Sequence, residues 1–211
     1  MRAEKRTPRD PRRAKWLVDY FNDDDVYIVG GGPSLDGFDF TRLEKERVIA
    51  INHSYRYCKP EILVFLDNKF KTECQRDFNH DLSEMPFKII CGPSSGMKSQ
   101  GNATVVHMAS KISTDPSRLH GRAQSGLVAI NAAIIGNAKN IYLLGFDGGF
   151  INGKGHFYSD DWRHSQDDNE NQYVKMNSKY NVYSEYKNIF NCSMDSRLTA
   201  FQKLSIDEVL K

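Results

Sequence analysis

The chain has 211 residues, of which 39% are hydrophobic and 27% charged, and its formal net charge is +2. A chain of this size and composition forms one ordinary globular domain, and its near-neutral charge gives no reason by itself to expect a nucleic-acid partner. It contains no apolar run near the roughly 20 residues that span a bilayer and no signal peptide, so we expect a soluble, cytoplasmic protein.

The cysteines agree with a reducing compartment. Cys58, Cys74, Cys91 and Cys192 are scattered along the chain and form no Cys-x-x-Cys pair. This spacing is typical of reduced structural thiols, and it argues against a disulfide framework or a zinc site.

A basic arm opens the chain. Residues 1–15 carry seven Lys and Arg side chains against two acidic ones. Such a segment can attract phosphate or an anionic surface, and it is the one part through which we expect any contact with nucleic acid. The simpler interpretation is a solvated arm that precedes a single domain at residues 16–211.

Apolar, β-branched runs then recur along the chain and predict buried parallel strands. These runs cover residues 26–29, 47–51, 61–66, 87–91 and 140–144, and a shorter run at 104–108 predicts an edge strand. An amphipathic segment at 14–21 and an Ala- and Ile-rich segment at 125–137 predict helices. Strands that alternate with helices predict an α/β fold with a Rossmann-like, doubly wound, mostly parallel sheet.

Small and polar residues stand at the carboxyl ends of these strands. Gly30, Gly31, Gly32 and Ser34 follow the first strand, Asn52 the second, Asp67 and Asn68 the third, and Asp147 the fifth. In doubly wound sheets, ligands bind beyond the carboxyl ends of the strands. We therefore expect these residues to converge on one ligand crevice.

The last third of the chain is divided between a polar segment and a short ordered tail. Residues 148–190 contain few aliphatic side chains and predict a lid over the strand ends. Four glycines between positions 148 and 155 give this segment backbone freedom ahead of His156. Further on, Ser205 and Glu208 have the spacing of a capping box and predict a final helix.

The triglycine turn at residues 30–32 lets the backbone approach a phosphate closely. It is not a P-loop, because no Gly-Lys-Ser/Thr follows, and Leu35 stands where the dinucleotide fingerprint has Gly or Ala. The second strand ends in Asn52 and not in the acid that holds an NAD ribose, so we do not expect nicotinamide chemistry. The alternative is a tight βα turn that binds nothing.

Several segments taken together resemble a known group of proteins. In chain order they are residues 26–35 (VYIVGGGPSL), 50–54 (AINHS), 64–68 (VFLDN), 125–126 (SG) and 139–147 (KNIYLLGFD). They are similar to the bacterial sialyltransferases of glycosyltransferase family 42. They are equally similar to a broader set with the same fold, which includes motility-associated glycosylation domains and archaeal 6-hydroxymethylpterin pyrophosphokinases. The resemblance covers residues 26–160 of the chain.

The resemblance implies a nucleotide site in which a CMP-sugar lies across the strand ends. The implied contacts are Gly30, Gly31, Gly32 and Ser34 beside the phosphate, Asn52 on ribose or phosphate, Asp67 or Asn68 near the nucleoside, and Ser125 and Gly126 closing the site. The chain departs from the family pattern at two places. Gly31 stands where the family usually has Asn, and Asp67 precedes Asn68 where the sialyltransferases have a lone Asn. The Asp67 carboxylate is more typical of the broader set, where it could hold Mg²⁺ on a triphosphate.

His156 is the candidate general base, because imidazole has an unperturbed pKa of about 6.5 and accepts a proton near neutrality. By the same resemblance, Tyr158 would donate a hydrogen bond to the departing phosphate. His164 is the rival base, and either histidine could instead be an ordinary surface residue of a polar loop. Asp147 could contact metal, ribose or a pterin-like ring, or it could simply cap a turn. The remaining histidines, His53, His80, His107 and His120, have no comparable placement.

Three functions remain open at this point. The first is an inverting glycosyltransferase that uses a nucleotide-activated sugar, most simply a CMP-sugar, and a hydroxyl acceptor, with His156 as base and no required cofactor. The second is a pyrophosphokinase that moves diphosphate from ATP to a small alcohol, with Asp67 and Asp147 near Mg²⁺. The third is a non-enzymatic nucleotide-binding module that uses the basic arm. The resemblance favours the first.

Overall fold

The computed structural model describes residues 11–121, 124–158 and 173–210. Eight strands form one parallel sheet in the order β10-β9-β8-β1-β2-β3-β4-β5, and β6 and β7 form a separate parallel pair. The strands are β1 Val26–Val29, β2 Arg47–Ile51, β3 Ile62–Asp67, β4 Lys88–Ser94, β5 Ala103–Val105, β6 His107–Ala109, β7 Arg118–His120, β8 Ile141–Leu144, β9 Ile189–Asn191 and β10 Gln202–Lys203. This arrangement confirms the predicted Rossmann-like sheet.

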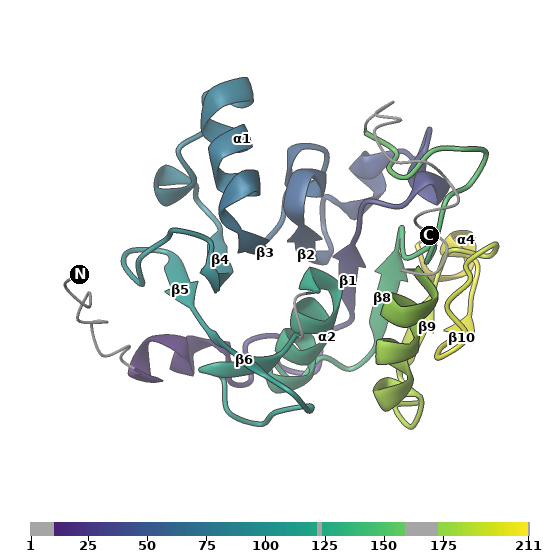
Figure 1. Ribbon diagram of the computed structural model, residues 1–211. Helices are drawn as coiled ribbons and strands as arrows, with labels where there is room; N and C mark the ends of the chain where they lie inside the picture. Colours follow the sequence, from purple (N-terminus) through teal and green to yellow (C-terminus); the bar gives the residue numbers. More distant parts are fainter. Residues whose placement is uncertain (1–10, 122–123, 159–172, 211) are drawn as a thin grey trace.

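Helices lie on the sheet and around its edges. α2 (Ser125–Ile135) lies in front of the middle of the sheet in Figure 1, and it contacts β1, β2 and β3. α1 (Asn68–Phe78) follows β3, α4 (Ile206–Val209) lies near the C-terminus, and residues 173–177 are also helical. Short 3₁₀ helices complete the set: η1 Pro11–Leu17, η2 Pro33–Leu35, η3 Phe40–Leu43, η4 Asn52–Arg56, η5 Leu82–Glu84 and η6 Ser178–Tyr183. In the described part of the chain, none of the helices has the length and apolar character needed to cross a membrane.

β1 shows how the sheet is buried on both faces. Val26 and Ile28 pack into the apolar cluster that contains the side chains of α2, whereas Tyr27 and Val29 pack into the opposite cluster, with Phe70 of α1. Successive side chains of a strand point to opposite faces, so both layers are filled by one short segment. A strand covered on both faces must be apolar at every position, which is why this run is continuous in the sequence.

The strand order places a crevice at the carboxyl end of β1. The chain builds β1 to β5 outward in one direction and later returns to place β8 on the other side of β1. Val29 at the end of β1 is in register with Ala50 of β2 and Leu144 of β8, so the three strands end at one level. A reversal of this kind is where open α/β sheets bind their ligands.

The structure differs from the expected elements where the backbone changes direction. The strand expected at 104–108 is divided at Val106, whose amide donates to Cys91 of β4, and the next residue pairs with Ser117 beside β7 instead. The helix expected at 14–21 is the 3₁₀ helix η1, which ends at Leu17 and begins inside the expected arm. It stops there because Asp19 has a left-handed φ of 53°, which a helix does not tolerate.

The polar segment at 148–190 is described at 148–158 and 173–190, and its second part is more structured than expected. It contains the helical residues 173–177 and η6, and it ends in β9, an internal strand of the sheet. The final helix is confirmed as α4, with a capping box between Ser205 and Glu208. Residues 1–10 of the expected basic arm lie outside the described residues.

Candidate functional site

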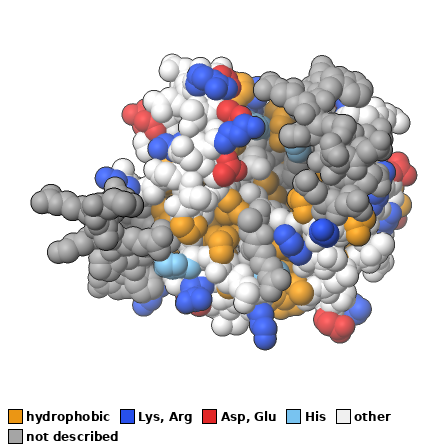
Figure 2. Space-filling view, viewed as in Figure 1, with side chains coloured by type: hydrophobic (Ala, Val, Ile, Leu, Met, Phe, Trp, Pro, Cys, Tyr) orange, Lys and Arg blue, Asp and Glu red, His pale blue; other side chains and the backbone are white. Residues whose placement is uncertain are grey.

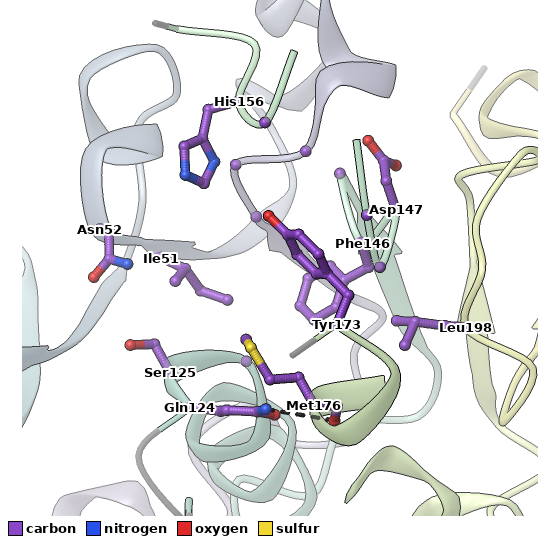
Figure 3. A pocket seen from close by; sticks show the side chains of 18 of the residues that line it. Ile51, Asn52, Gln124, Ser125, Phe146, Asp147, His156, Tyr173, Met176 and Leu198 are labelled. Atoms are coloured by element: carbon purple, nitrogen blue, oxygen red, sulfur yellow. Dashed lines mark hydrogen bonds between the residues drawn. The ribbon is translucent and has the colours of Figure 1, made fainter. Parts of the chain in front are cut away.

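A cleft of about 330 Å³ opens at the carboxyl ends of β1, β2, β3 and β8. Its volume lies at the lower end of the range for small-molecule sites. Ten of the residues expected from the sequence line it: Gly30, Gly31, Gly32, Asn52, Asp67, Ser125, Gly126, Asp147, His156 and Tyr158. Figure 3 shows the His156 ring, the Asn52 amide and the Tyr173 hydroxyl around one space. The strand-end residues expected to converge therefore do line one cleft.

The face that Figure 2 displays carries apolar side chains across its middle and side chains of both charge signs around them. The described residues that line the cleft include the acids Asp67 and Asp147 and neither Lys nor Arg. Backbone amides and neutral polar groups are therefore the donors that these lining residues offer to an anionic ligand.

The triglycine turn is tied to the end of β8. The amide of Gly32 donates to the carbonyl of Gly145 at 2.9 Å, and a Cβ on Gly30 would lie 2.7 Å from that same carbonyl oxygen. A Cβ on Gly32 would collide with the Asp147 carboxylate. These positions need glycine because other backbone and side-chain atoms approach them closely.

Asp147 is buried, and its carboxylate binds the turn that follows the glycines. It accepts hydrogen bonds from the Ser34 amide at 2.8 Å and from the Ser34 hydroxyl at 2.5 Å. The Ser34 hydroxyl also contacts that of Ser193 at 2.9 Å. Ser34 is not among the residues that line the cleft, and its amide faces a carboxylate where the resemblance implied a phosphate. The bond between Ser34 and Asp147 locks β1 to β8 across 113 positions of sequence.

Asn52 occupies the end of β2 in an unusual backbone conformation. Its φ is 50°, in the left-handed region that Asn tolerates better than most residues. Its side-chain Oδ1 is buried without a hydrogen-bond partner among the described residues, although the residue lines the cleft. A buried polar atom without a partner costs free energy, so a ligand donor that paired with it would gain affinity.

The amino end of α2 forms the wall opposite His156 (Figure 3). Gln124 caps this helix without a side-chain hydrogen bond to its amides, and the first-turn amides of a helix have no partner within it. Gln124 is 7% exposed, and its Oε1 also lacks a partner within the described part of the chain, whereas its Nε2 donates to the carbonyl of Met176 at 3.4 Å. Free amides and the helix dipole make this end of α2 suitable for an anionic group.

Asp67 and Asn68 differ in position. Asp67 lines the cleft and also caps α1, since its Oδ1 accepts from the amide of Phe70 at 2.9 Å. Asn68 is not a lining residue, and its side chain lies beside Gly96, where a Cβ would be 2.5 Å from the Asn68 Oδ1. Of the two residues expected near the nucleoside, only Asp67 reaches the cleft in the described structure.

His156 and Tyr158 form a stacked pair against Gly31. Their ring centroids are 5.1 Å apart with an interplanar angle of 6°. A Cβ on Gly31 would lie 2.8 Å from the Tyr158 hydroxyl and 2.9 Å from the His156 Nδ1, and the amide of Phe157 donates to the Gly31 carbonyl at 3.0 Å. Glycine at position 31 thus makes room for both rings.

The surroundings of this pair lower the pKa of His156 and raise that of Tyr158. His156 is exposed on the cleft side, yet the crowding of protein around it lowers its pKa below the usual 6.5, with the charge of His53 acting in the same direction. A backbone hydrogen bond with Gly31 opposes this effect. Burial raises the pKa of Tyr158 to about 12. At neutral pH His156 is a proton acceptor and Tyr158 a hydrogen-bond donor.

The carboxylates that a magnesium site would use are engaged elsewhere. Asp147 gives both carboxylate oxygens to Ser34, and Asp67 gives one to α1. Within residues 11–121, 124–158 and 173–210, no three His, Cys, Asp or Glu side chains gather as a metal site. These residues do not fit the protein part of a metal centre, and we derive no step through one.

The second wall of the cleft was not expected from the sequence. It is built by Tyr173, Met176, Asn177 and Tyr180 of the polar segment, with Leu198 and residues 148–149. The many Tyr and Asn residues of that segment were the only sequence feature that could have indicated a binding wall. Hydrophobic periodicity does not show where the segment lies relative to the strands. Of the candidate bases, His164 lies outside the described residues, so the structure places only His156 in the cleft.

A scan against protein-family models gives no match for this chain, and a search of curated proteins gives none either.

Proposed function

We propose that the chain is an inverting glycosyltransferase that binds a nucleotide-activated sugar, most simply a CMP-sugar, in this cleft. The observation that carries the proposal is the stacked pair of His156 and Tyr158, packed on Gly31 across the cleft from the amino end of α2. It brings a neutral imidazole and a protonated phenol to the carboxyl ends of the strands, where such sheets bind ligands.

The roles of the cleft residues follow from their chemistry. The first turn of α2, with Ser125 and Gly126, would receive an anionic group of the donor, and the unpartnered oxygens of Asn52 and Gln124 would accept hydrogen bonds from its hydroxyl or amino groups. Tyr158 would donate a hydrogen bond to the leaving phosphate. No metal is required in this scheme, because the positive end of the helix dipole and the donors meet the developing charge.

The reaction would be a direct displacement. The acceptor oxygen forms a bond to the anomeric carbon, the bond from that carbon to the donor phosphate breaks, and the nucleotide leaves with its electron pair. The proton of the acceptor hydroxyl passes to His156. Because Nδ1 of His156 faces Gly31, we assign this proton to Nε2.

Nucleotide binding tests the first half of the proposal. Calorimetric titration with CMP, CDP, UDP, GDP and ATP, each with and without Mg²⁺, should give the tightest binding for CMP without metal. Asn52→Gly keeps the left-handed backbone but removes the side chain, so we expect roughly tenfold weaker CMP binding with an unchanged fold. Preference for ATP with Mg²⁺ would instead support the pyrophosphokinase, and no binding of any nucleotide would support neither enzyme.

Donor hydrolysis tests the second half without knowledge of the acceptor, because water can take the acceptor's place. Release of CMP from a panel of CMP-sugars should fall by about 10²–10⁴-fold in His156→Asn, while CMP affinity is retained. In the wild type, kcat/KM should fall as the pH drops through the lowered pKa of His156, below 6.5. His107→Asn, an exposed histidine on β6, is the matched control and should behave as wild type. Equal loss of affinity and turnover in His156→Asn would contradict its role as base.

A further inference from the structure

A second histidine lies next to the candidate base, in a setting that the proposed roles leave unused. His53 belongs to η4, directly after Asn52. Its ring makes edge contacts with Phe70 at 4.9 Å and Phe78 at 5.8 Å, and with Tyr158 at 5.5 Å between centroids. One side of the ring therefore faces α1 and another faces the partner of His156.

His53 is held by a carboxylate from α1. Its Nε2 lies 3.0 Å from Oε2 of Glu73, and their side chains are only 18% and 23% exposed. A carboxylate is an acceptor only, so Nε2 carries a hydrogen in this pair. The other ring nitrogen, Nδ1, is buried and has no partner in the part of the chain that the structure describes. The pair with Glu73 thus fixes the orientation of the imidazole, as carboxylates do for histidines at functional sites.

We propose that Glu73 and His53 are positioning residues for the cleft, which hold Tyr158 and, through it, the His156 imidazole in their stacked geometry. The proposal deepens the proposed transferase function and rests on it for its effect on turnover. The contacts form a continuous chain from α1 to the cleft: Glu73 to His53, His53 edge-on to Tyr158, and Tyr158 stacked on His156. Neither Glu73 nor His53 lines the cleft, so both would act through Tyr158.

Electrostatics supports the same chain. The charge of His53 contributes to lowering the pKa of His156, which favours the neutral form that a general base needs. Loss of His53 should therefore let His156 bind a proton more readily.

The other charged groups around His53 belong to three elements. From α1, Lys69 lies 3.7 Å from the other oxygen of Glu73 and is 85% exposed, while Asp77 is 39% exposed and paired with Arg76. From η4 itself, Arg56 stacks over the Phe78 ring at 3.6 Å. The segment at 155–158 contributes His156 and Tyr158. Solvent screens the two exposed α1 charges, which leaves Glu73 as the close, half-buried counter-charge.

The test measures the protonation of His156 directly. With ¹³C-labelled histidine, NMR titration follows each imidazole in the full chain, and His156→Asn assigns its signal. His53→Asn should raise the pKa of His156 toward its ordinary value. His53→Asn and Glu73→Gln should each change the ring-current shift that Tyr158 imposes on the His156 signal. Lys69→Gln is the matched control, since it touches the same carboxylate from the solvent side, and it should leave the His156 titration in place.

Activity supplies the second readout. In CMP-sugar hydrolysis, both variants should lower kcat with KM for the donor unchanged, and His53→Asn should also move the acidic limb of the pH profile upward by the same amount as the NMR pKa. Glu73→Gln alters one partly exposed atom and serves if His53→Asn does not fold. An unchanged His156 ring-current shift in Glu73→Gln would overturn the positioning role while leaving the transferase proposal intact. A changed ring-current shift in a protein that hydrolyses no CMP-sugar would uphold the contact chain and overturn the function.

Discussion

At the scale of single residues, three adjacent glycines are required for three different reasons. Gly30 adjoins the backbone carbonyl of Gly145, Gly31 adjoins the rings of His156 and Tyr158, and Gly32 adjoins the Asp147 carboxylate. None of them needs a left-handed φ, so close approach and not turn geometry explains the glycines. The effect of a substitution by Ala therefore depends on whether the neighbouring group can move away from the added methyl group.

Gly30→Ala and Gly31→Ala should therefore separate stability from activity. The carbonyl beside Gly30 belongs to a core strand end and cannot move, so Gly30→Ala should lower the free energy of unfolding by about 1–3 kcal/mol in urea denaturation. The rings beside Gly31 can move, so Gly31→Ala should keep stability near wild type but lower donor hydrolysis at least tenfold. Gly37→Ala, whose Cβ would meet no described atom within 4 Å and which does not line the cleft, is the control for activity. Wild-type activity in Gly31→Ala would show that the stacked pair is not needed.

At the scale of elements, α1 supplies both a wall of the core and the Glu73 side chain. Its sequence is dominated by charged and polar residues, and only Phe70 and Cys74 are buried, one turn apart. The helix begins at the side-chain cap of Asp67 and ends at Asn79, which has a left-handed φ of 53°. With so narrow an apolar stripe, the caps define this helix more clearly than its periodicity does.

Asp67 therefore has a structural role that can be separated from ligand binding. Asp67→Ala removes the cap and should lower the free energy of unfolding by about 1 kcal/mol in urea denaturation. Asp67→Asn should restore that stability, because Asn caps helices about as well as Asp. If CMP affinity follows stability through both variants, Asp67 is only a cap. A loss of affinity in the stable Asp67→Asn would place its charge at the ligand.

At the scale of the whole molecule, the C-terminal residues are hydrogen-bonded to the central strand β1 and to η3. The Tyr27 hydroxyl of β1 donates to the carbonyl of Val209 at 3.0 Å, and Arg42 donates to that of Leu210 at 2.6 Å. Leu210 is itself 3% exposed, inside the cluster that packs on one face of β1 and β8. This short tail therefore covers one side of the sheet beneath the cleft.

Removal of residues 202–211 should destabilise the whole domain. The truncation deletes β10, uncovers Tyr27 and loses the burial of Leu210, and we expect a decrease of about 2–4 kcal/mol in the free energy of unfolding. A truncation that ends at Leu210 keeps these contacts and is the control. Equal urea midpoints for the two chains would show that the tail does not contribute to the stability of the fold.

The longer strands of the sheet can be predicted from the sequence, whereas the residues that line the second wall of the cleft cannot. β1 and β2 occupy the residues that their apolar runs predict, because strands covered on both faces must be apolar throughout. β9 and β10 are three and two residues long and give no pattern of their own. Gln124 and Tyr180 were not predicted as cleft residues for another reason. Nothing in the sequence shows which side chains between the strands point toward the strand ends.

The sequence by itself determined the parallel sheet and which residues stand where its strands end, since both follow from local hydrophobic pattern and the direction of the chain. Only the tertiary structure decided which of those residues share a partner. In the folded chain, the Ser34 amide and hydroxyl donate to Asp147, and His156 and Tyr158 both pack against Gly31. His53 pairs with Glu73, which lies 20 positions further along the sequence. Such pairings depend on how separate segments pack against one another, and hydrophobic periodicity carries no information on side-chain contacts between distant segments.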